Sequence, residues 1–332
     1  MIKKLAIKNF KSIKDVELDC ERINLLIGEP NTGKSNLLEA LGVLSWLGYG
    51  SSGLGLKDSV RYQTMSNFFY DGNLDEPVRI EITNQHKIEI NIKFKDDFFQ
   101  LIQVESVQQA RKEKTLCSFN YFKENSYPEQ NTALQFIKFY RFKSQEEFKD
   151  FHSSFLLPPH GSNLFSVVMA HPNLRKIMSS FFKNFGFNVV LKPQEKRFEI
   201  QKQVEDIVIS YPYSLASDTL QRIIFHVIAI ESNKNSTLVF EEPEAHAFPY
   251  YTKYLGERIA FDKTNQYFIA THNPYLLRAI IEKAPTEDVR VFVCYFEDYE
   301  TKVKPLKRNQ LSDLIEHDPF FNLNYFLEEE DD

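Results

Sequence analysis

Apolar runs of strand length alternate with stretches of helical periodicity near the start of the 332-residue chain. The runs LAIKNF and DVELD predict two strands within residues 1–20, joined by a turn. Ile23 to Ile27 form a continuous apolar run that suits a buried strand, and residues 35–47 place leucines and Trp46 at helical spacing. The sequence therefore predicts a strand, a loop and a helix, in that order, after a pair of strands.

The same alternation returns after residue 205. A helical pattern at about 217–232 precedes the strand STLVF, and a second at about 248–262 precedes the strand QYFIA. A third helix begins at Pro274 and leads to the strand VRVFVCYF. Strands that alternate with helices in this way form parallel, doubly wound sheets, so we predict the α/β class.

The middle of the chain has a different pattern. Residues 77–94, PVRIEITNQHKIEINIKF, alternate apolar and polar positions about a polar centre, which indicates a hairpin. Helical spacing predicts one helix over VRYQTMSNFF (60–69) and another over HPNLRKIMSSFFKNF (171–185). The second of these helices is followed by the strand-like run GFNVVLKP.

Together these patterns predict one domain built from two separated segments. Residues 1–72 and 205–332 carry the strand and helix alternation, and residues 73–204 form an α+β insertion between them. The insertion lacks sustained heptads, so we expect no long coiled coil in it.

Composition narrows the class of protein. Hydrophobic residues at 42% and charged residues at 26% are typical of a globular protein, and the net charge of −6 argues against a general electrostatic attraction to nucleic acid. Cys20, Cys117 and Cys294 lie far apart, so we expect free thiols rather than metal ligands. No segment approaches the roughly 20 apolar residues of a membrane span, and the N-terminus lacks a signal-peptide core. We therefore expect a cytoplasmic protein without a membrane partner.

The loop between the first predicted buried strand and its helix reads GEPNTGKS and fits G-x-x-x-x-G-K-[ST]. Its two glycines let successive N–H groups turn toward phosphate oxygens, and the following helix directs its positive end at the same anion. We call residues 28–35 the phosphate loop. The residues predicted to contact a nucleotide here are Gly28, Glu29, Pro30, Asn31, Thr32, Gly33, Lys34, Ser35 and Asn36.

Two residues of the phosphate loop carry specific chemistry. Lys34 is expected to reach the β- and γ-phosphates of a nucleotide and so to take part in catalysis. The hydroxyl of Ser35 is expected to bind Mg²⁺. The sequence thus predicts a nucleoside triphosphate with Mg²⁺ as the ligand.

A second acidic motif follows the strand STLVF directly. Carboxylates at the carboxyl end of a parallel strand face the crevice where such sheets bind ligands. Glu241 is predicted to hold Mg²⁺, directly or through water, and Glu242 to orient and deprotonate the attacking water. An acidic turn after a core strand is usually only solvated, but its combination with a phosphate loop favours the catalytic interpretation.

The strand QYFIA ends at Thr271 and His272, and Asn273 with Pro274 suits the start of a helix. His272 should therefore lie at the same rim as Glu242, where it can polarise the γ-phosphate or the attacking water. A histidine that only caps the helix is the alternative. No HExxH pattern occurs, and no pair of histidines has zinc-ligand spacing.

The order of these motifs resembles the SMC-like branch of ABC-type ATPases. The matching stretches are LAIKNFKSIKDVEL, INLLIGEPNTGKSNLLEAL, LASDTLQR, LVFEEPEAHAFP and FIATHNP, within about 1–50 and 210–282. They look most like the OLD-like group, the ATPase domains of overcoming-lysogenization-defect nucleases and of the Gabija defence ATPase. The resemblance implies a P-loop NTPase head of ABC/SMC type with a mixed sheet. About 50 residues follow the His272 helix, so we expect no TOPRIM nuclease domain.

The resemblance also implies how such heads work. Two heads bind head to tail, and each ATP lies between one phosphate loop and the partner's signature motif. Ser217 would be the signature serine that faces the γ-phosphate, but Asp218 and Thr219 stand where the family has its glycine. His246 falls at the position of the dimer-contacting loop, and His272 matches the switch histidine. The resemblance further assigns nucleotide contacts to Lys11 and Ser12, and Gln63 is available as the Q-loop glutamine.

Three functions stay open at this point. The first is a homodimeric or larger ATPase whose nucleotide cycle controls a separately encoded nuclease or toxin, in phage defence by resemblance. The second is an ATPase that engages DNA through basic runs at 191–197 and 302–308. The third is a scaffold that binds ATP and hydrolyses it negligibly, which the missing signature glycine keeps open. ATP is preferred to GTP by resemblance alone.

Overall fold

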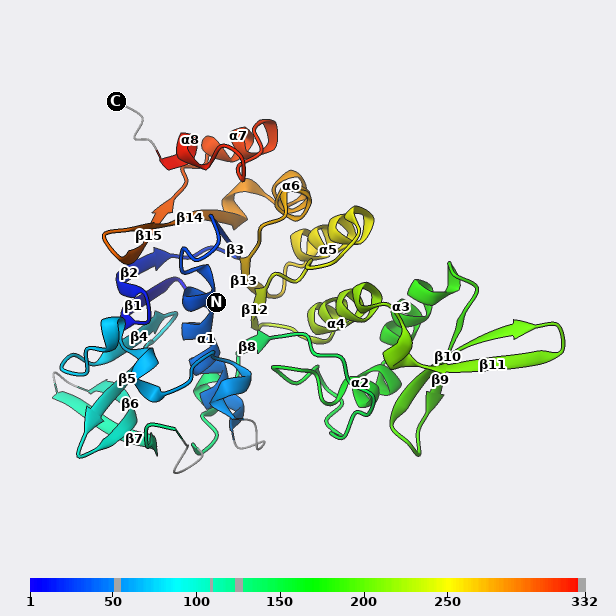
Figure 1. The fold of residues 1–332 in the computed structure, drawn as a ribbon, viewed down its shortest axis with the longest axis horizontal. Helices are drawn as coiled ribbons and strands as arrows, with labels where there is room; N and C mark the ends of the chain where they lie inside the picture. The colour runs from blue at the N-terminus through cyan, green and yellow to red at the C-terminus, as the bar shows by residue number, and fades with distance from the viewer. Residues whose placement is uncertain (51–54, 108–109, 123–127, 328–332) are drawn as a thin grey trace.

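The computed structural model describes residues 1–50, 55–107, 110–122 and 128–327. Two six-stranded sheets lie on either side of the long helix α1, and a three-stranded sheet projects from one end of the molecule (Figure 1). Within these ranges, no helix is both long enough and apolar enough to cross a membrane.

The central sheet is mixed, with the strand order β15-β14-β3-β13-β12-β8. Five strands run parallel, and β15 pairs antiparallel with β14 at the edge. This sheet confirms the predicted α/β fold with a mixed sheet. Its strands are β3 (Ile23–Ile27), β8 (Ile137–Tyr140), β12 (Thr237–Glu241), β13 (Gln266–Ala270), β14 (Val289–Glu297) and β15 (Glu300–Pro305).

The second sheet is antiparallel throughout, with the order β2-β1-β4-β5-β6-β7. It packs its apolar face on α1 (Lys34–Tyr49), which is buried almost all round because both sheets contact it. The strands are β1 (Lys4–Phe10), β2 (Ile13–Asp19), β4 (Val78–Thr83), β5 (Lys87–Lys95), β6 (Phe98–Val107) and β7 (Ala110–Phe119).

Strand β3 shows why the phosphate loop is held firmly. Leu25 and Ile27 pack into the core beneath the C-terminal helices, whereas Leu26 packs into the core around α1. A strand buried on both faces needs a continuous apolar run, and INLLI supplies one. The loop that follows β3 therefore starts from a fixed point at the carboxyl edge of the central sheet.

Helices α4 (Asp218–Ser232), α5 (Pro249–Phe261) and α6 (Pro274–Lys283) cover the face of the central sheet opposite α1 (Figure 1). Prolines at the first positions of α5 and α6 lack an N–H that would be unpaired there in any case. Two short helices, α7 (Gln310–Glu316) and α8 (Leu323–Leu327), follow β15.

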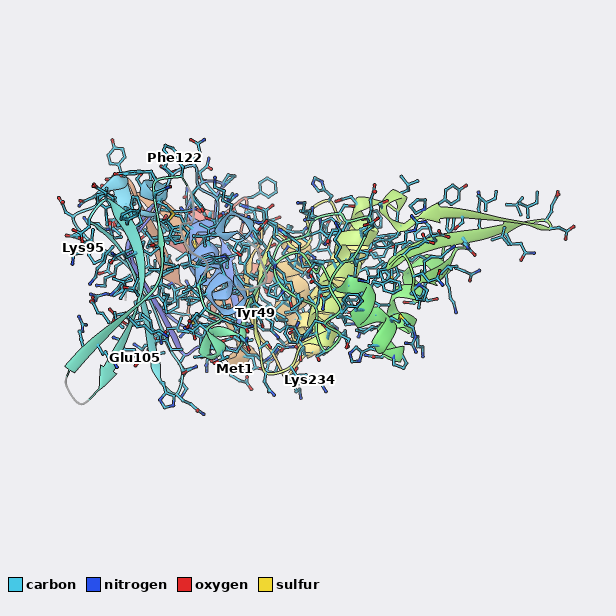
Figure 2. The ribbon with its side chains drawn as sticks, turned by 90° about the horizontal axis from the view of Figure 1, so that it is seen from below. Met1, Tyr49, Lys95, Glu105, Phe122 and Lys234 are labelled. Atoms are coloured by element: carbon cyan, nitrogen blue, oxygen red, sulfur yellow. The ribbon has the colours of Figure 1, made fainter. Side chains whose placement is uncertain are left out.

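The projecting part contains α2 (Leu164–Ala170), α3 (Pro172–Lys183) and the sheet β11-β10-β9. Its strands are β9 (Asn188–Lys192), β10 (Arg197–Val204) and β11 (Ile207–Pro212). The hairpin of β10 and β11 points away from the body, and the edge with Lys95 and Glu105 lies at the opposite end of the molecule (Figure 2).

Most elements agree with the sequence patterns, including the hairpin within 77–94 and the helix within 171–185. The prediction of a helix over 60–69 is wrong, because within its second half only a short 3-10 turn, Met65–Phe68, forms. Phe68 and Phe69 are both buried, and Phe69 forms an isolated bridge with Phe10. This chain reversal onto β1 is incompatible with a continuous helix.

The predicted insertion shares the sheets of the rest of the chain. Strand β4 pairs with β1, and β8 pairs with β12, so strands from within 73–204 belong to both large sheets. The division into 1–72, 73–204 and 205–332 remains a prediction. We propose the segment from α2 to β11 as the part that is separate from the two large sheets.

Candidate nucleotide-binding site

The phosphate loop runs against the β14–β15 hairpin at its two glycines. Gly28 has φ 146° and Gly33 has φ 91°, and both values disfavour other residues. A Cβ at Gly28 would lie 2.1 Å from the carbonyl oxygen of Cys294, and one at Gly33 would lie 2.0 Å from Oγ1 of Thr301. Glycine is therefore needed at both places for close approach as well as for backbone angle.

Lys34 is folded back on its own loop. Its Nζ donates to the carbonyl oxygens of Gly28 at 2.8 Å and Glu29 at 2.6 Å. Burial lowers the pKa of Lys34, and the nearby carboxylates of Glu242 and Glu29 oppose that shift. The ammonium group thus lies over the loop, where the oxygens of an anion can replace the two carbonyl oxygens as its hydrogen-bond acceptors.

A cavity of about 660 Å³ opens at the carboxyl edge of the central sheet beside this loop. Its volume lies in the range of small-ligand and cofactor sites. The cavity brings together most residues predicted for the site and adds two that were not predicted, Arg61 and Phe296. The lining residues are Lys11, Ser12, Pro30, Asn31, Thr32, Gly33, Lys34, Ser35, Asn36, Arg61, Glu242, His272 and Phe296.

Ser12 links the turn between β1 and β2 to the cavity. Its hydroxyl accepts a hydrogen bond from Nδ2 of Asn36 at 2.7 Å and lies 2.7 Å from Oγ1 of Thr301. The backbone N–H of Thr301 donates to the carbonyl oxygen of Ser12 at 2.7 Å. These contacts place Ser12 beside the start of α1, and its contact with a nucleotide stays a prediction.

Glu242 and His272 come from the ends of neighbouring strands and meet at the rim of the cavity. Nε2 of His272 lies 3.5 Å from Oε1 of Glu242. Partial burial lowers the pKa of His272, and the charge of Lys34 lowers it further. The imidazole is therefore neutral near pH 7. The Glu242 carboxylate can accept a hydrogen bond from a water at the rim, and the imidazole can donate to the same water or accept from it.

Glu244 is linked by hydrogen bonds to the residues that flank His272. Its buried carboxyl accepts a hydrogen bond from the hydroxyl of Thr271, and Oγ1 of Thr271 accepts one from the backbone N–H of Asn273 at 3.0 Å. Burial raises the pKa of Glu244 to about 7. Glu244 thus fixes the residues on both sides of His272, a role that the sequence reasoning did not assign.

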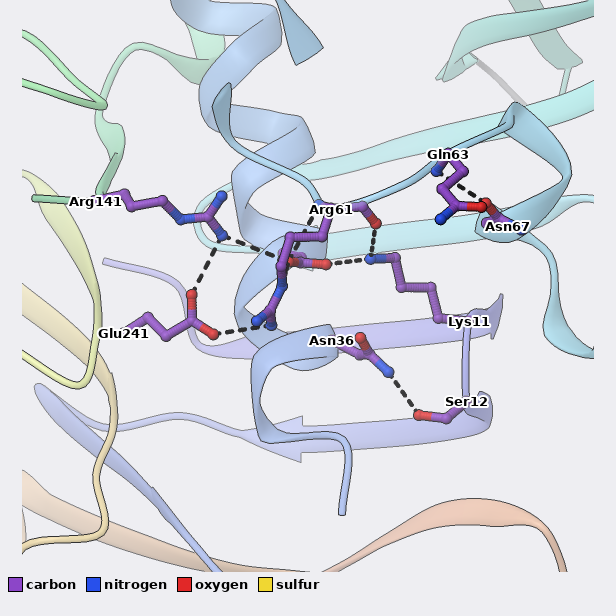
Figure 3. A network of polar contacts seen from close by, with 9 residues as sticks. Lys11, Ser12, Asn36, Arg61, Gln63, Asn67, Arg141 and Glu241 are labelled. Carbon is purple, nitrogen blue, oxygen red and sulfur yellow. Dashed lines mark hydrogen bonds and ion pairs between the residues drawn. The ribbon is translucent and has the colours of Figure 1, made fainter. Parts of the chain in front are cut away.

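Glu241 is held by two arginines rather than facing the cavity alone (Figure 3). Its carboxylate accepts from Nη2 of Arg61 at 3.0 Å and from Nη2 of Arg141 at 3.2 Å. Both arginines also reach Glu39 on α1, which is fully buried and pairs with Lys11 as well. The cluster therefore joins Lys11, which was assigned to nucleotide contact, to Glu241, which was assigned to the metal.

The donors predicted for Mg²⁺ fit in part. Ser35 lines the cavity, and its hydroxyl is of the hard oxygen type that Mg²⁺ prefers. Glu241 is not among the lining residues, and each of its carboxylate oxygens accepts one hydrogen bond from an arginine, which leaves lone pairs free for a metal or a metal-bound water. Ser35 would hold the metal together with the phosphates, and Glu241, from outside the lining, would act on it directly or through a water.

Ser217 lies outside the cavity, at the start of α4. Its hydroxyl caps the helix by accepting from the backbone N–H of Leu220 at 3.3 Å. Thr219 donates from its hydroxyl to the carbonyl oxygen of His246 at 2.7 Å, which joins the signature segment to the loop after β12. Asp218, the residue in the glycine position, pairs with Arg222 at 3.5 Å.

Gln63 lies near the cavity but does not line it. Its backbone N–H donates to Oδ1 of Asn67 at 3.0 Å (Figure 3), and it borders a neighbouring hollow that also includes Lys11 and Arg61. The structure thus places Gln63 beside the charged cluster, without bringing it to the phosphate loop.

Known proteins match this chain over most of its length. The model of a family described as AAA ATPase domain matches residues 1–212. A Helicobacter pylori protein named ATP/GTP phosphatase is 23% identical over 374 residues, covering 100% of this chain and 99% of the relative.

Two solved structures share the fold. An Smc head bound to the C-winged helix domain of ScpA has a TM-score of 0.56 and 15% identity, covering 94% of this chain and 99% of its own. An Smc head with an extended coiled coil, bound to the C-terminal domain of ScpA from Pyrococcus furiosus, has a TM-score of 0.53 and 14% identity, covering 95% and 98%. At such identities the likeness concerns the fold alone, which confirms the expected SMC-type head. The phosphate loop, the carboxyl-edge cavity and the matching family model together show that this chain belongs to the AAA ATPase domain family and is an ATPase with the fold of an SMC head.

Proposed function

We propose that this ATPase hydrolyses ATP with Mg²⁺ at a site completed by a second copy, and that its nucleotide cycle controls a partner protein. The observation that carries the hydrolytic part is the cavity itself. It gathers the phosphate loop, Glu242 and His272, and Glu242 supplies a carboxylate at the edge where water would attack. We assign Glu242 as the general base and His272 as the residue that orients the water with it.

Each residue has a task that follows from its position. Lys34 leaves the carbonyl oxygens of Gly28 and Glu29 and pairs with the β- and γ-phosphates. Glu242 accepts the proton of the attacking water, and neutral His272 fixes that water through a hydrogen bond. Mg²⁺ would neutralise charge on the phosphate oxygens when it is bound beside Ser35.

The second copy is proposed because the signature segment does not reach the cavity of its own chain. Ser217 caps α4 elsewhere. Leu215, two residues before it, is 70% exposed, and Phe248, two residues after the His246 that Thr219 bonds, is 68% exposed. An exposed apolar surface around a helix start is suited to contact with another protein surface. In a head-to-tail pair, this surface of one copy would close the cavity of the other.

The partner and the nucleotide are proposed from the similar proteins and from the family resemblance. The similar Smc heads were solved with domains of ScpA, which supports a protein partner for this chain too. A nuclease or toxin in phage defence rests on the resemblance to OLD-like ATPases. The name of the Helicobacter pylori relative supports both ATP and GTP as substrates. DNA remains a second candidate partner, which salt-dependent binding would reveal.

The test is Mg²⁺-dependent ATP hydrolysis over a range of protein concentrations, with wild type, Glu242→Gln and Glu282→Gln. Glu282 lies on the surface of α6 in an i,i+4 pair with Arg278, so its variant is the matched control. We expect turnover per chain to rise with concentration and Glu242→Gln to lose about 10²-fold or more of it. If Glu242→Gln turns over ATP like the control, the assignment of the base is wrong. Turnover that does not depend on concentration would instead contradict the composite site.

A further inference from the structure

The rim of the nucleotide cavity contains one exposed aromatic side chain that the proposed chemistry does not use. Phe296, near the end of β14, lines the cavity together with the phosphate loop, and it is 50% exposed. All other lining side chains are charged, polar or small. Among the described residues, no aromatic ring packs on Phe296 at stacking distance.

The position of Phe296 follows from the sheet register. Val293 of β14 pairs with Ile27, the last residue of β3, so Phe296 lies three residues beyond the point where β3 turns into the phosphate loop. It therefore extends past the carboxyl edge of the central sheet, on the side where the loop holds phosphates.

The hairpin that carries Phe296 is fixed to the phosphate loop. Phe296 pairs across the hairpin with Thr301, which is fully buried. Thr301 bonds Ser12 through both its backbone N–H and its hydroxyl, each at 2.7 Å. It also lies so close to Gly33 that no side chain fits between them. The ring is thus presented from a rigid support next to Ser12 and the start of α1.

We propose that Phe296 stacks on the base of the bound nucleotide, an inference that rests on the proposed function. A nucleotide with its phosphates on the loop must place its base at the rim of the cavity, and Phe296 offers a flat apolar surface there. Base–aromatic stacking is favourable for every base, because each has a π-face. The ring therefore adds affinity for the nucleoside part without choosing between adenine and guanine.

The experiment compares two nucleotides with a ligand that has no nucleoside. Binding of ADP, GDP and inorganic pyrophosphate is measured by calorimetry for the full chain, with Phe296→Ala, Phe296→Trp and Tyr299→Ala. Tyr299 is a neighbouring aromatic residue on the same hairpin, 83% exposed and not part of the cavity lining, which makes it the matched control. Pyrophosphate binding also reports whether each variant keeps a folded phosphate loop.

We expect Phe296→Ala to weaken ADP and GDP binding alike by about tenfold or more, with pyrophosphate binding unchanged. Phe296→Trp should bind the nucleotides at least as tightly as wild type, and Tyr299→Ala should match wild type. Equal losses for ADP and pyrophosphate, or an unchanged ADP affinity in Phe296→Ala, would overturn the stacking role but leave the proposed function standing. A wild type that binds neither ADP nor pyrophosphate would overturn both.

Discussion

Glu244 is an acidic residue beside the site whose burial raises its own pKa. Its side chain is almost completely buried, and one carboxyl oxygen, Oε2, has no hydrogen-bond partner among the described residues. The other oxygen accepts from Thr271, one residue before His272. A protonated carboxyl satisfies this environment better than an ionised one, which is the physical cause of its raised pKa.

The raised pKa predicts a pH dependence of stability. Glu244 titrates near 7 in the folded chain and near its ordinary value of 4.5 when unfolded. The folded state therefore holds this proton over the interval between these values, and the stability gained below pH 4.5 is lost as the pH rises toward 7. The loss attributable to this group is about 3 kcal/mol.

The measurement is the free energy of unfolding in urea between pH 4.5 and 7.5, for wild type and Glu244→Gln. Gln keeps the acceptor for Thr271 but cannot ionise, so wild type should lose stability relative to the variant as the pH rises. Taking the difference removes the opposite trend of His226, whose pKa burial lowers to about 3 in both proteins. A difference that stays constant across the interval would show that Glu244 does not change its charge on folding.

The residues of the site differ in how far the sequence could identify them. Lys34, Ser35, Glu242 and His272 belong to short motifs at strand ends, and the structure brings all four to one cavity. Arg61 and Arg141 carry no such signal. They become site residues because the chain places them between Glu39 and Glu241, from segments separated by 80 residues in the sequence. Phe296 likewise depends on strand register rather than on any local pattern.

At the scale of elements, the β14–β15 hairpin is the support of the phosphate loop. It touches the loop at Gly28 through a backbone carbonyl and at Gly33 through the side chain of Thr301. If a Cβ were added at each glycine, a second substitution could relieve the clash at Gly33 but not the clash at Gly28. A side chain can be shortened, but a carbonyl group within a paired strand cannot move away without breaking the sheet.

We therefore predict an asymmetry between two glycine substitutions. Gly28→Ala and Gly33→Ala should each destabilise the fold by about 2 kcal/mol or more, because in both a Cβ clashes with a neighbour and φ is unfavourable. Adding Thr301→Ala removes the two nearest atoms at Gly33, Oγ1 and Cγ2, and should restore part of the stability of Gly33→Ala. The same addition should not help Gly28→Ala.

Urea unfolding of the single and double variants, with Thr301→Ala alone as the reference, gives the coupling energy for each pair. Equal effects of Thr301→Ala in both glycine backgrounds would contradict the contact at Gly33. Recovery can only be partial, because the backbone angle at Gly33 stays unfavourable for alanine.

Strands and helices could be predicted from the sequence where the local pattern of apolar and polar residues determined their structure. INLLI suits a buried strand and PVRIEITNQHKIEINIKF has the alternation of a hairpin, and both form as expected. The segment 60–69 has helical spacing, yet its aromatic residues pack into the second sheet and the chain reverses there. The sharing of strands between the predicted insertion and the large sheets is a tertiary pairing, and no local pattern in β4 or β8 specifies it.

At the scale of the molecule, the main question is whether one chain holds a complete site. The cavity is lined by residues of the phosphate loop, Glu242 and His272, whereas Ser217 caps α4 outside it. The proposed composite site would take Lys34 and Glu242 from one chain and Ser217 from the other. In a symmetric pair, each chain contributes once in each role.

This arrangement predicts which inactive variants restore each other when mixed. Lys34→Ala and a bulky substitution, Ser217→Tyr, damage opposite sides of the composite site. A heterodimer of the two variants has one site with both defects and one site with neither. Random pairing makes about half of the dimers mixed, so an equal mixture should recover up to about a quarter of wild-type ATP hydrolysis. The measurement is the hydrolysis rate of the mixture against each variant alone at the same total concentration.

The control mixes Lys34→Ala with Glu242→Gln. These residues line the same cavity of the same chain, so every site in every mixed dimer keeps one defect, and no recovery is expected. Recovery in both mixtures would show that the restored hydrolysis does not come from pairing the intact half-site of one variant with that of the other. If neither mixture recovers, although Ser217→Tyr remains folded and binds ADP, Ser217 does not complete the site of a second chain, and hydrolysis must be explained within a single head.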